Sequence, residues 1–432
     1  MNLDILSVRF RTAMRVAMVC VLLSPAAARA DVVLDWNVIA VDTAIANGQS
    51  PFAQARFAAI VQLAVFEAVN AINREYAPYL VVNGAPVITA APGASADAAA
   101  IAAAYRVLWT YFSSNPLTAT ALNAARASSL AAIPDGQSKD DGITVGEAAA
   151  AAMTAARAND GSAPPAFYVP GDSIIGMWQA TPSCPINPAT GLRRGVFAQW
   201  GNITPFGIPD AAAFIPEAPP SIQSTRYVKD YNEVMTVGGV NSTARPQDRA
   251  DVARFYAASS PTYLLNAVAR QLSEARGDTM SENARALALI NMSINDGLIV
   301  SFATKYTYIL WRPETAIRAD DGNPKTDRDQ AFMPYIVTPC FPSYPSNHAS
   351  GTNSGLEALR RLYGAAGHSI TLTNPAVAGL TYDYTSLKQI SDDVDDARVY
   401  GGIHFRFDQE VGGRLGREVA TYVVKNNLGK VQ

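Results

Sequence analysis

The sequence has little cysteine and few charged residues for its length. Only three of its 432 residues are cysteine, so neither a disulfide-rich scaffold nor a zinc site built from several cysteines is expected. The formal net charge is −3, which argues against a nucleic-acid-binding protein of the simple, strongly basic kind. Apolar residues make up 49% and charged residues 16%, and this balance predicts a folded chain with a sizeable core.

Long hydrophobic runs are also lacking. No apolar run approaches the roughly 20 residues that a membrane-spanning helix needs, so no integral membrane segment is expected. The first 30 residues instead show a secretory signal pattern, with arginines, a short apolar run from Val16 to Leu23 and small residues up to Ala30. We therefore expect residues 1–30 to be a signal peptide cleaved near Ala30, and the mature chain to be secreted or periplasmic. The alternative is a buried N-terminal helix.

Two cysteines, Cys184 and Cys340, remain in the expected mature chain. They can form a disulfide in an oxidising compartment, but the sequence alone does not show that their geometry permits it.

Helical patterns dominate the rest of the chain, and strand signals are few. Eleven of the 27 prolines fall between Gly161 and Pro220, which rules out one long helix there and predicts a packed connector. The chain is therefore predicted to be all-α, with two helical bundles: an N-terminal region with the connector (31–220) and a C-terminal helical domain (221–432). The predicted helices are 52–76, 95–112, 118–132, 146–158, 222–237, 248–258, 262–276, 281–303, 346–363, 386–400 and 407–426, and the best strand is 369–372.

His348, one of only three histidines, follows a segment with two prolines. Ser346 stands where a helix can begin, and the free N–H groups of a helix start favour anions. The alternative is an ordinary helix cap with a surface histidine.

His404 lies four residues before Asp408, so the two share a helix face and the carboxylate can fix the ring tautomer. Arg398 and Gly402 show the same spacing.

Lys305 and Arg312 are separated by a mostly apolar run. Cations in such a setting either have a function or are buried with partners, because unpaired burial is costly; the alternative is a pair of surface cations with partly covered stems. Together with Arg398, they form a cationic set suited to a tetrahedral oxyanion. One histidine could bond to the central atom of that anion, and the other could transfer protons.

These segments resemble the three motifs of the superfamily of type 2 phosphatidic acid phosphatases and vanadium-dependent haloperoxidases. The motifs K-x6-R-P, P-S-x-H and S-R-x3-G-x-H-x3-D appear here as Lys305–Pro313, Pro345–His348 and Ala397–Asp408, in the same order and with intact internal spacing. The resemblance implies an all-α fold and an active site in the C-terminal bundle.

The resemblance also implies roles by position. His404 would bind the vanadium of vanadate or attack phosphate, His348 would be the acid–base, and Asp408 would orient His404. Asp296 stands where the family often has an acidic partner for the arginine of its last motif. Lys305, Arg312, Arg398, Ser346 and the backbone N–H of Asn347 would hold the oxygens of the anion.

Two residues depart from the family pattern. The usual serine before the last arginine is Ala397, and the usual glycine before the acid–base histidine is Asn347, whose side chain could narrow the pocket. Pro339 and Phe341 resemble the positions that shape an apolar halide pocket in the chloroperoxidase-like branch. Phe302 stands where that branch can carry tryptophan.

The resemblance implies a haloperoxidase that oxidises halide with hydrogen peroxide to hypohalous acid, with vanadate as cofactor and a small organic acceptor. The alternatives are a soluble acid phosphatase that acts through a phosphohistidine at the same site, and a non-enzymatic phosphate- or partner-binding protein. His368 is expected in a surface turn and Asp392–Asp396 on an acidic helix face. Trp178, Trp200 and Phe206 either line the channel or pack the connector.

Overall fold

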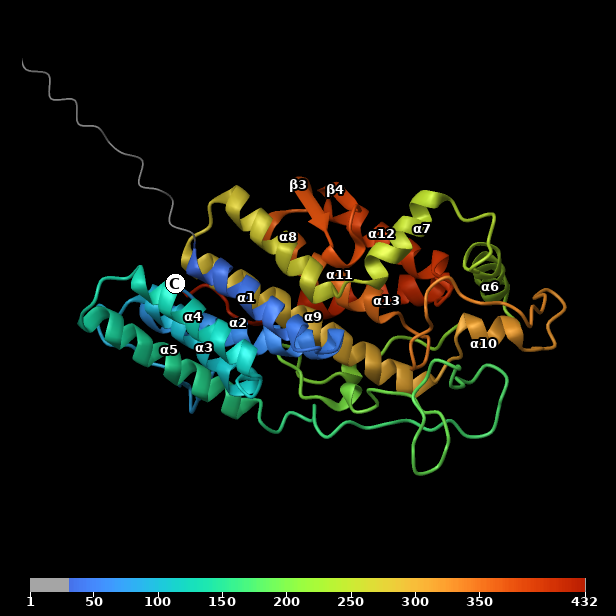
Figure 1. Ribbon diagram of the computed structural model, residues 1–432, viewed down its shortest axis with the longest axis horizontal. Helices are drawn as coiled ribbons and strands as arrows, with labels where there is room; N and C mark the ends of the chain where they lie inside the picture. The colour runs from blue at the N-terminus through green and yellow to red at the C-terminus, as the bar shows by residue number, and fades with distance from the viewer. Residues whose placement is uncertain (1–30, 432) are drawn as a thin grey trace, which may run out of the picture.

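The computed structural model describes residues 31–431 and shows a mostly helical molecule (Figure 1). The all-α prediction is confirmed, since the strands in this range form only two short antiparallel pairs. Residues 1–30, on which the signal-peptide prediction falls, lie outside the described residues.

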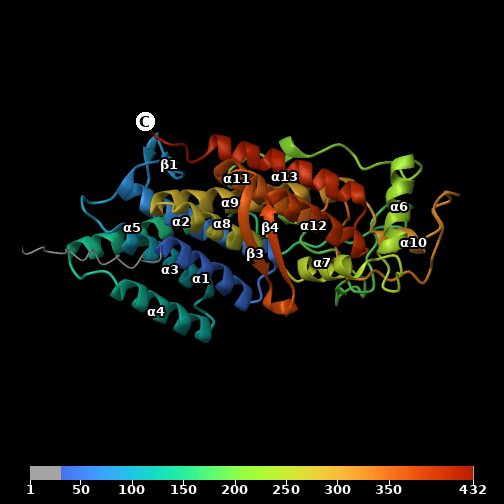
Figure 2. The same ribbon diagram turned by 90° about the horizontal axis from the view of Figure 1, so that it is seen from above.

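Five helices form the N-terminal part of the fold and gather at one end of the molecule (Figures 1 and 2). Ser95 caps α3 as predicted, since its hydroxyl accepts a hydrogen bond from the Ala98 amide at 3.2 Å. Helix α1 precedes the first helix that the sequence pattern predicts. The elements are α1 (Val32–Ala46), α2 (Pro51–Asn73), β1 (Val81–Val82), β2 (Ala85–Pro86), α3 (Ala96–Phe112), α4 (Pro116–Ala131) and α5 (Gln137–Ala156).

The C-terminal part contains the remaining helices and the larger strand pair. The predicted strand is confirmed as part of β3, so His368 lies in a strand instead of the expected turn. The acidic segment lies on α12, where Asp393 and Asp396 both pair with Arg249. The elements are α6 (Thr225–Val237), α7 (Gln247–Ala257), α8 (Pro261–Arg276), α9 (Met280–Tyr308), α10 (Pro313–Arg318), α11 (Asn347–Tyr363), β3 (Ala366–Thr373), β4 (Thr381–Ser386), α12 (Leu387–Tyr400) and α13 (Arg406–Asn426).

Helix α9 joins the two parts, because it packs against α2 on one side and against α8, α11 and α13 on others. One apolar cluster consequently includes residues from both halves of the chain. Contrary to the sequence expectation, α2 and α9 are long and apolar enough to cross a membrane by length and composition alone. However, 83% and 94% of their most apolar windows are buried inside the protein, as in core helices of a folded domain.

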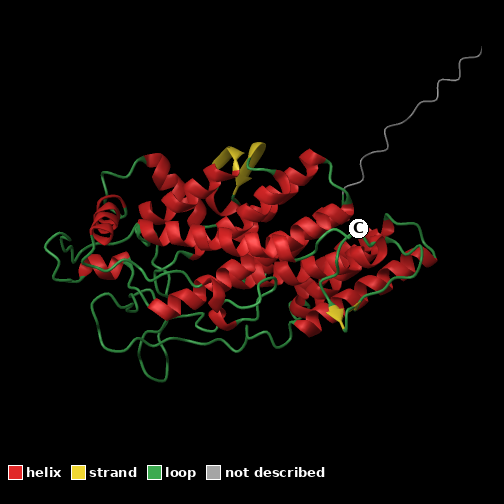
Figure 3. Cartoon of the chain, turned by 180° about the vertical axis from the view of Figure 1, so that it is seen from behind, coloured by secondary structure: helices red, strands yellow, loops and turns green. Residues whose placement is uncertain are grey.

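The proline-rich connector contains no α-helix and runs along the surface as loops (Figure 3), with two 3-10 turns, η1 (Trp200–Asn202) and η2 (Ala212–Phe214). Backbone hydrogen bonds hold it to the C-terminal part, from Trp178 N to Ile309 O at 2.7 Å and from Val196 N to Cys340 O at 2.9 Å. Trp178, Trp200 and Phe206 are buried and pack the connector.

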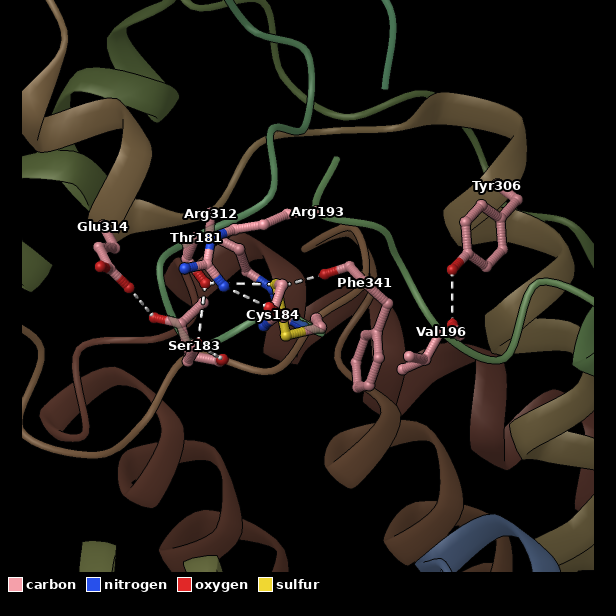
Figure 4. The surroundings of a disulfide bond; sticks show 11 residues. Thr181, Ser183, Cys184, Arg193, Val196, Tyr306, Arg312, Glu314 and Phe341 are labelled. Atoms are coloured by element: carbon pink, nitrogen blue, oxygen red, sulfur yellow. Dashed lines mark hydrogen bonds between the residues drawn. A yellow bond between two sulfur atoms is a disulfide. The ribbon is translucent and has the colours of Figure 1, made fainter. Parts of the chain in front are cut away.

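A disulfide between Cys184 and Cys340 also ties the connector to the loop that precedes His348 (Figure 4). The Cα atoms of the two cysteines lie 5.3 Å apart, within the usual range for a disulfide. The guanidinium of Arg193 donates to the Cys184 carbonyl at 2.6 Å. The connector is therefore fixed beside Phe341 and the residues around it.

Candidate active site

The start of α11 places His348 beside the last motif. Ser346 caps this helix, and its backbone N–H donates to the Asp408 carbonyl at 3.0 Å. Helix α13 lies so close to α11 that only glycine fits at their contact. A Cβ on Gly416 would lie 2.4 Å from the Ser350 carbonyl oxygen.

Gly402 turns the chain between α12 and α13. Its φ is +77°, and an added Cβ would meet the Gly238 carbonyl oxygen at 2.2 Å. A side chain at this position would be strained in conformation and would collide with backbone. The turn brings Arg398, at the end of α12, and His404, just before α13, to the same cavity.

His404 is held in one tautomer by its neighbours. Its Nδ1 lies 2.8 Å from Asp408 Oδ2, and its Nε2 lies 2.9 Å from Arg312 Nη1. The carboxylate only accepts and the guanidinium only donates, so Nδ1 carries the proton and Nε2 presents its lone pair. Ser343 fixes the carboxylate in turn by donating to Oδ2 at 2.6 Å. The expected spatial pairing of His404 and Asp408 is thus present.

Arg312 and Arg398 are both fully buried and have no carboxylate partner among residues 31–431. Arg312 donates to the carbonyls of Phe341 and Ile403, each at 2.9 Å, but its Nη2 has no hydrogen-bond partner. Nε and Nη1 of Arg398 are also without partners. Because a buried charge without a partner is costly, these N–H groups indicate a site for an acceptor-bearing anion.

Lys305 lies in the last turn of α9 and is completely buried. Its ammonium group donates to the carbonyls of Pro342 and Ser343, at 2.8 and 2.7 Å, and to that of Pro345. All three N–H groups of the ammonium are therefore used by one loop. The lysine thus holds the loop that leads into α11, and its expected contact with an anion stays a prediction.

A small cavity of about 40 Å³ is lined by Arg398 and by both histidines of the motifs, while Lys305 and Arg312 are not part of its lining. By the same measure one water needs about 10–15 Å³, so the cavity has room for a guest of a few heavy atoms. His348, Arg398, His404 and Asn347 supply its polar lining. The apolar lining consists of Pro51, Phe52, Pro261, Leu298, Pro339 and Phe341.

Two larger cavities meet the small one at His348, which is half-buried. One, of about 610 Å³, is lined mainly by apolar residues of the connector and of the Pro339–Phe341 loop. The other, of about 480 Å³, has a more polar wall that includes Asp42 and Ser259. His348 therefore stands between the small cavity and both larger ones, a suitable place for a proton-transfer group.

Burial and mutual repulsion shape the electrostatics of the site. Burial lowers the pKa of Arg312 to about 9, and burial with the nearby Arg312 charge does the same for Arg398. The pKa values of His348 and His404 are held well below the usual range, chiefly by burial and then by these arginines. Burial raises the pKa of Asp408 to about 6. Both histidines are thus neutral at pH 7, while the arginines keep their charge.

Two expected placements need correction. Phe302 is fully buried behind Phe52 and Phe341, with ring centroids at 4.6 and 5.4 Å, and does not line the small cavity. The carboxylate of Asp296 does not pair with Arg398. It accepts hydrogen bonds from the backbone amides of the connector at Phe206, Gly207 and Ile208, at 2.7, 2.6 and 3.0 Å.

Sequence reasoning missed the part of the cavity wall that comes from other segments. Pro51 and Phe52 begin α2, Pro261 begins α8 and Leu298 lies on α9. A proline at a helix start is a signal in the sequence, but it does not reveal that this start lies against a motif far along the chain. Within residues 31–431, no group of three or more His, Cys, Asp and Glu side chains is placed to hold a metal cation.

Comparison with known proteins points to the same family as the three sequence motifs. A family model described as the VCPO second helical-bundle domain matches residues 285–431, the range that holds all three motifs. The resemblance to the vanadium-dependent haloperoxidase superfamily is confirmed. Vanadium chloroperoxidase from Curvularia inaequalis is 32% identical over 91 residues, which make up 18% of this chain and only 14% of that protein.

Two solved vanadium haloperoxidase structures share the fold over most of the chain. A bacterial vanadium-dependent iodoperoxidase has a TM-score of 0.77 and 23% identity, covering 93% of this chain and 97% of its own. An apo bacterial vanadium-dependent chloroperoxidase has a TM-score of 0.67 and 15% identity, covering 87% of this chain and 95% of its own. At these identities the comparison shows the haloperoxidase fold, including its N-terminal half.

Proposed function

We propose that this chain is a vanadate-dependent haloperoxidase. It would convert hydrogen peroxide, halide and a proton into hypohalous acid and water, and the hypohalous acid would halogenate a small organic acceptor. The observation that carries the proposal is the set of buried N–H groups without partners on Arg398, which lines the small cavity, and on Arg312, which donates to the unprotonated Nε2 of His404.

The residues of the cavity fit vanadate. Its oxygens accept hydrogen bonds, and the groups without partners on Arg312 and Arg398 are donors. The one bonding nitrogen, His404 Nε2, is neutral and held by Asp408 through the opposite side of the ring. The Arg312 N–H that now donates to Nε2 can instead pair with an oxygen of the anion. Bound vanadate would supply Lewis-acid activation of peroxide without changing its own oxidation state.

The chain's own groups then divide the remaining work. His348 would take a proton from hydrogen peroxide that enters the cavity and return it to the oxygen that leaves as water, since it faces both the small cavity and the larger ones. The Ser346 hydroxyl and the backbone N–H of Asn347 would add hydrogen bonds to the anion. Lys305 would fix the loop that carries Ser346, because it binds three carbonyls of that segment.

The apolar wall would form the halide side of the cavity. Pro339, Phe341 and Phe52 line the small cavity, and we assign the halide contact to these three residues in place of Phe302. Such a wall excludes water, which strengthens every electrostatic interaction inside.

The names of the relatives favour the peroxidase over the phosphatase, since those described above are a chloroperoxidase or an iodoperoxidase by name. The anion cage itself suits either reaction. A phosphatase would use His404 as nucleophile and His348 as the acid that protonates the leaving oxygen.

One purified sample distinguishes the two. Halogenation of an activated diketone is measured with peroxide and chloride, bromide or iodide, before and after loading with orthovanadate, and phosphate release is measured from an aryl phosphate. We expect halogenation that depends on vanadate, is lost in His404→Ala and is kept in His368→Ala. Absent halogenation after loading, together with robust ester hydrolysis, would establish the phosphatase instead.

We also propose that the protein acts outside the cytoplasm. The Cys184–Cys340 disulfide is a feature typical of oxidising compartments and agrees with the predicted signal peptide. Mass spectrometry of the exported protein should give a mature N-terminus at Asp31 and an intact disulfide. An uncleaved chain retained in the cell would contradict this proposal.

A further inference from the structure

Asn347 stands where the haloperoxidase and phosphatase motifs usually have glycine, so this chain has a side chain that the motif lacks. It is the first residue of α11 and is only 4% exposed. Its side chain lines the small cavity together with His348, Arg398 and His404. The substitution therefore changes the chemistry of the cavity itself.

The amide of Asn347 is held from one side only. Its Oδ1 accepts a hydrogen bond from the Ser301 hydroxyl at 2.6 Å, and Ser301 is completely buried on α9, one turn before Lys305. Its Nδ2 is buried and has no hydrogen-bond partner. A buried amide nitrogen without an acceptor costs free energy in the unliganded protein, so the arrangement calls for a ligand with acceptor atoms.

We propose that the Asn347 side chain is a further oxyanion ligand of this chain, positioned by Ser301. The proposal rests on the proposed function of the cavity as an oxyanion site. It adds a neutral donor to the cationic donors of Arg312 and Arg398, and it is distinct from the backbone N–H of the same residue.

The surroundings favour the amide nitrogen as the group that faces the guest. An amide can turn about its last bond, and the Ser301 hydroxyl can donate to Oδ1 or accept from Nδ2. A guest whose surface consists of oxygen acceptors selects the orientation with Nδ2 inward. Ser301 then holds Oδ1 away from the anion, which would otherwise be repelled by it.

The test measures anion binding without peroxide or halide, by calorimetric titration with orthovanadate and separately with inorganic phosphate. We expect Asn347→Asp to weaken both by at least about 100-fold, because it replaces the donor with a negative charge. Asn347→Gly should weaken both by about 10-fold, the effect of one hydrogen bond to a charged group. Ser301→Ala should cost less, about 3-fold, since the amide is kept but no longer held.

Matched controls separate these effects from general damage. Asn353→Asp puts the same charge on α11 further from the cavity, where Arg417 already faces the amide oxygen. Ser293→Ala removes a buried hydroxyl of α9 that donates only to the Leu289 carbonyl of its own helix. Both controls should bind vanadate and phosphate within about 2-fold of the natural protein. Circular dichroism and unfolding temperature confirm that each variant is folded.

Each outcome is decisive. Unchanged or tighter anion binding by folded Asn347→Gly would overturn the proposal, and tighter binding would show that the side chain only narrows the cavity. Unchanged anion binding with a raised KM for halide would overturn it in favour of a halide contact. A natural protein that binds neither anion would also overturn it. If the natural protein binds both anions but shows no halogenation, the proposed function fails while the assignment of Asn347 stands.

Discussion

Two buried arginine clusters in this protein have opposite surroundings. In the N-terminal part, Arg56 and Arg157 share the carboxylate of Asp160, at 2.7 and 3.2 Å, and donate to nearby backbone carbonyls. At the candidate site, Arg398 lines the small cavity and Arg312 contacts His404, which also lines it. Neither arginine has a carboxylate partner within the described chain, and three of their nitrogens have no hydrogen-bond partner.

This difference distinguishes arginines that are buried for structural reasons from arginines that form a binding site. Burial raises the pKa of Asp160, but its hydrogen bond and charge interaction with Arg56 lower it more, so the cluster carries its own counter-ion. Arg312 and Arg398 repel one another, and an arginine does not give up its proton near neutral pH. Their charge is therefore left for a guest to neutralise.

The largest expected effect comes from removing the counter-ion of the structural cluster. Asp160→Ala leaves Arg56 and Arg157 buried without a carboxylate, and we expect the free energy of unfolding to fall by about 3–5 kcal/mol. Urea denaturation measures it. The control Asp135→Ala removes an exposed carboxylate that pairs with Lys139 and should leave stability unchanged. If Asp160→Ala is no more harmful than this control, the carboxylate of the N-terminal cluster is not what makes burial of its arginines tolerable.

Removing an arginine at the candidate site is expected to weaken anion binding without lowering stability. Arg398→Met should weaken binding of vanadate and phosphate by about 100-fold, which corresponds to about 2.7 kcal/mol, because a charge-assisted donor pair is lost. The same change should not lower the free energy of unfolding, since it removes a buried cation without a counter-ion. Calorimetric titration and urea denaturation give the two values. If the variant unfolds more easily but binds vanadate and phosphate normally, Arg398 has a structural role like that of Arg56 and Arg157.

The buried carboxyl group of Glu67 shows how a buried charge affects stability as the pH changes. Burial raises the pKa of Glu67 from 4.5 to about 7, so below about pH 4.5 the carboxyl is neutral in both states and has no destabilising effect. Between pH 4.5 and 7 the unfolded chain loses this proton while the folded protein keeps it, so stability falls over this range and levels off above pH 7. We expect Glu67→Gln to be more stable than the natural protein by about 3 kcal/mol at pH 8, with no difference at pH 4.

Urea denaturation across this pH range measures the effect. If the free energy of unfolding changes with pH in Glu67→Gln as it does in the natural protein, Glu67 is not the cause of the loss of stability. A buried carboxyl can shed its charge by taking up a proton, whereas Arg312 and Arg398 cannot shed theirs, and this is why only the arginines call for a guest.

The smallest effect belongs to an exposed pair. Lys388 and Asp392 on α12 lie 2.6 Å apart, but both side chains are mostly exposed. Lys388→Ala should change the free energy of unfolding by about 0.5 kcal/mol or less, and added salt should reduce the difference further. A loss comparable with that of Asp160→Ala would mean that burial is not the deciding factor.

Local signals in the sequence predicted the helices and the core of the site. The cap at Ser95, the strand within β3 and the spacing of His404 and Asp408 all act between residues a few positions apart, and such signals are legible in the sequence. The three motifs are short for the same reason, and the structure brings His348, Arg398 and His404 to one cavity.

The remaining features depend on contacts between distant segments. Phe52 reaches the cavity wall only because α2 packs against α9, and Asp296 meets the connector instead of Arg398. Lys305 has the position expected of an anion ligand, but three loop carbonyls take its N–H groups. None of these partners is specified by local spacing, so the sequence could not reveal them.

The most direct measurement is a crystal structure of the protein soaked with orthovanadate, with vanadium located by its anomalous scattering. We expect one vanadium per chain within bonding distance of His404 Nε2, with its oxygens contacted by Arg312 and Arg398. A vanadium bound elsewhere, or a cavity that stays free of it at saturating vanadate, would contradict the central claim that these unpaired arginines form an oxyanion site.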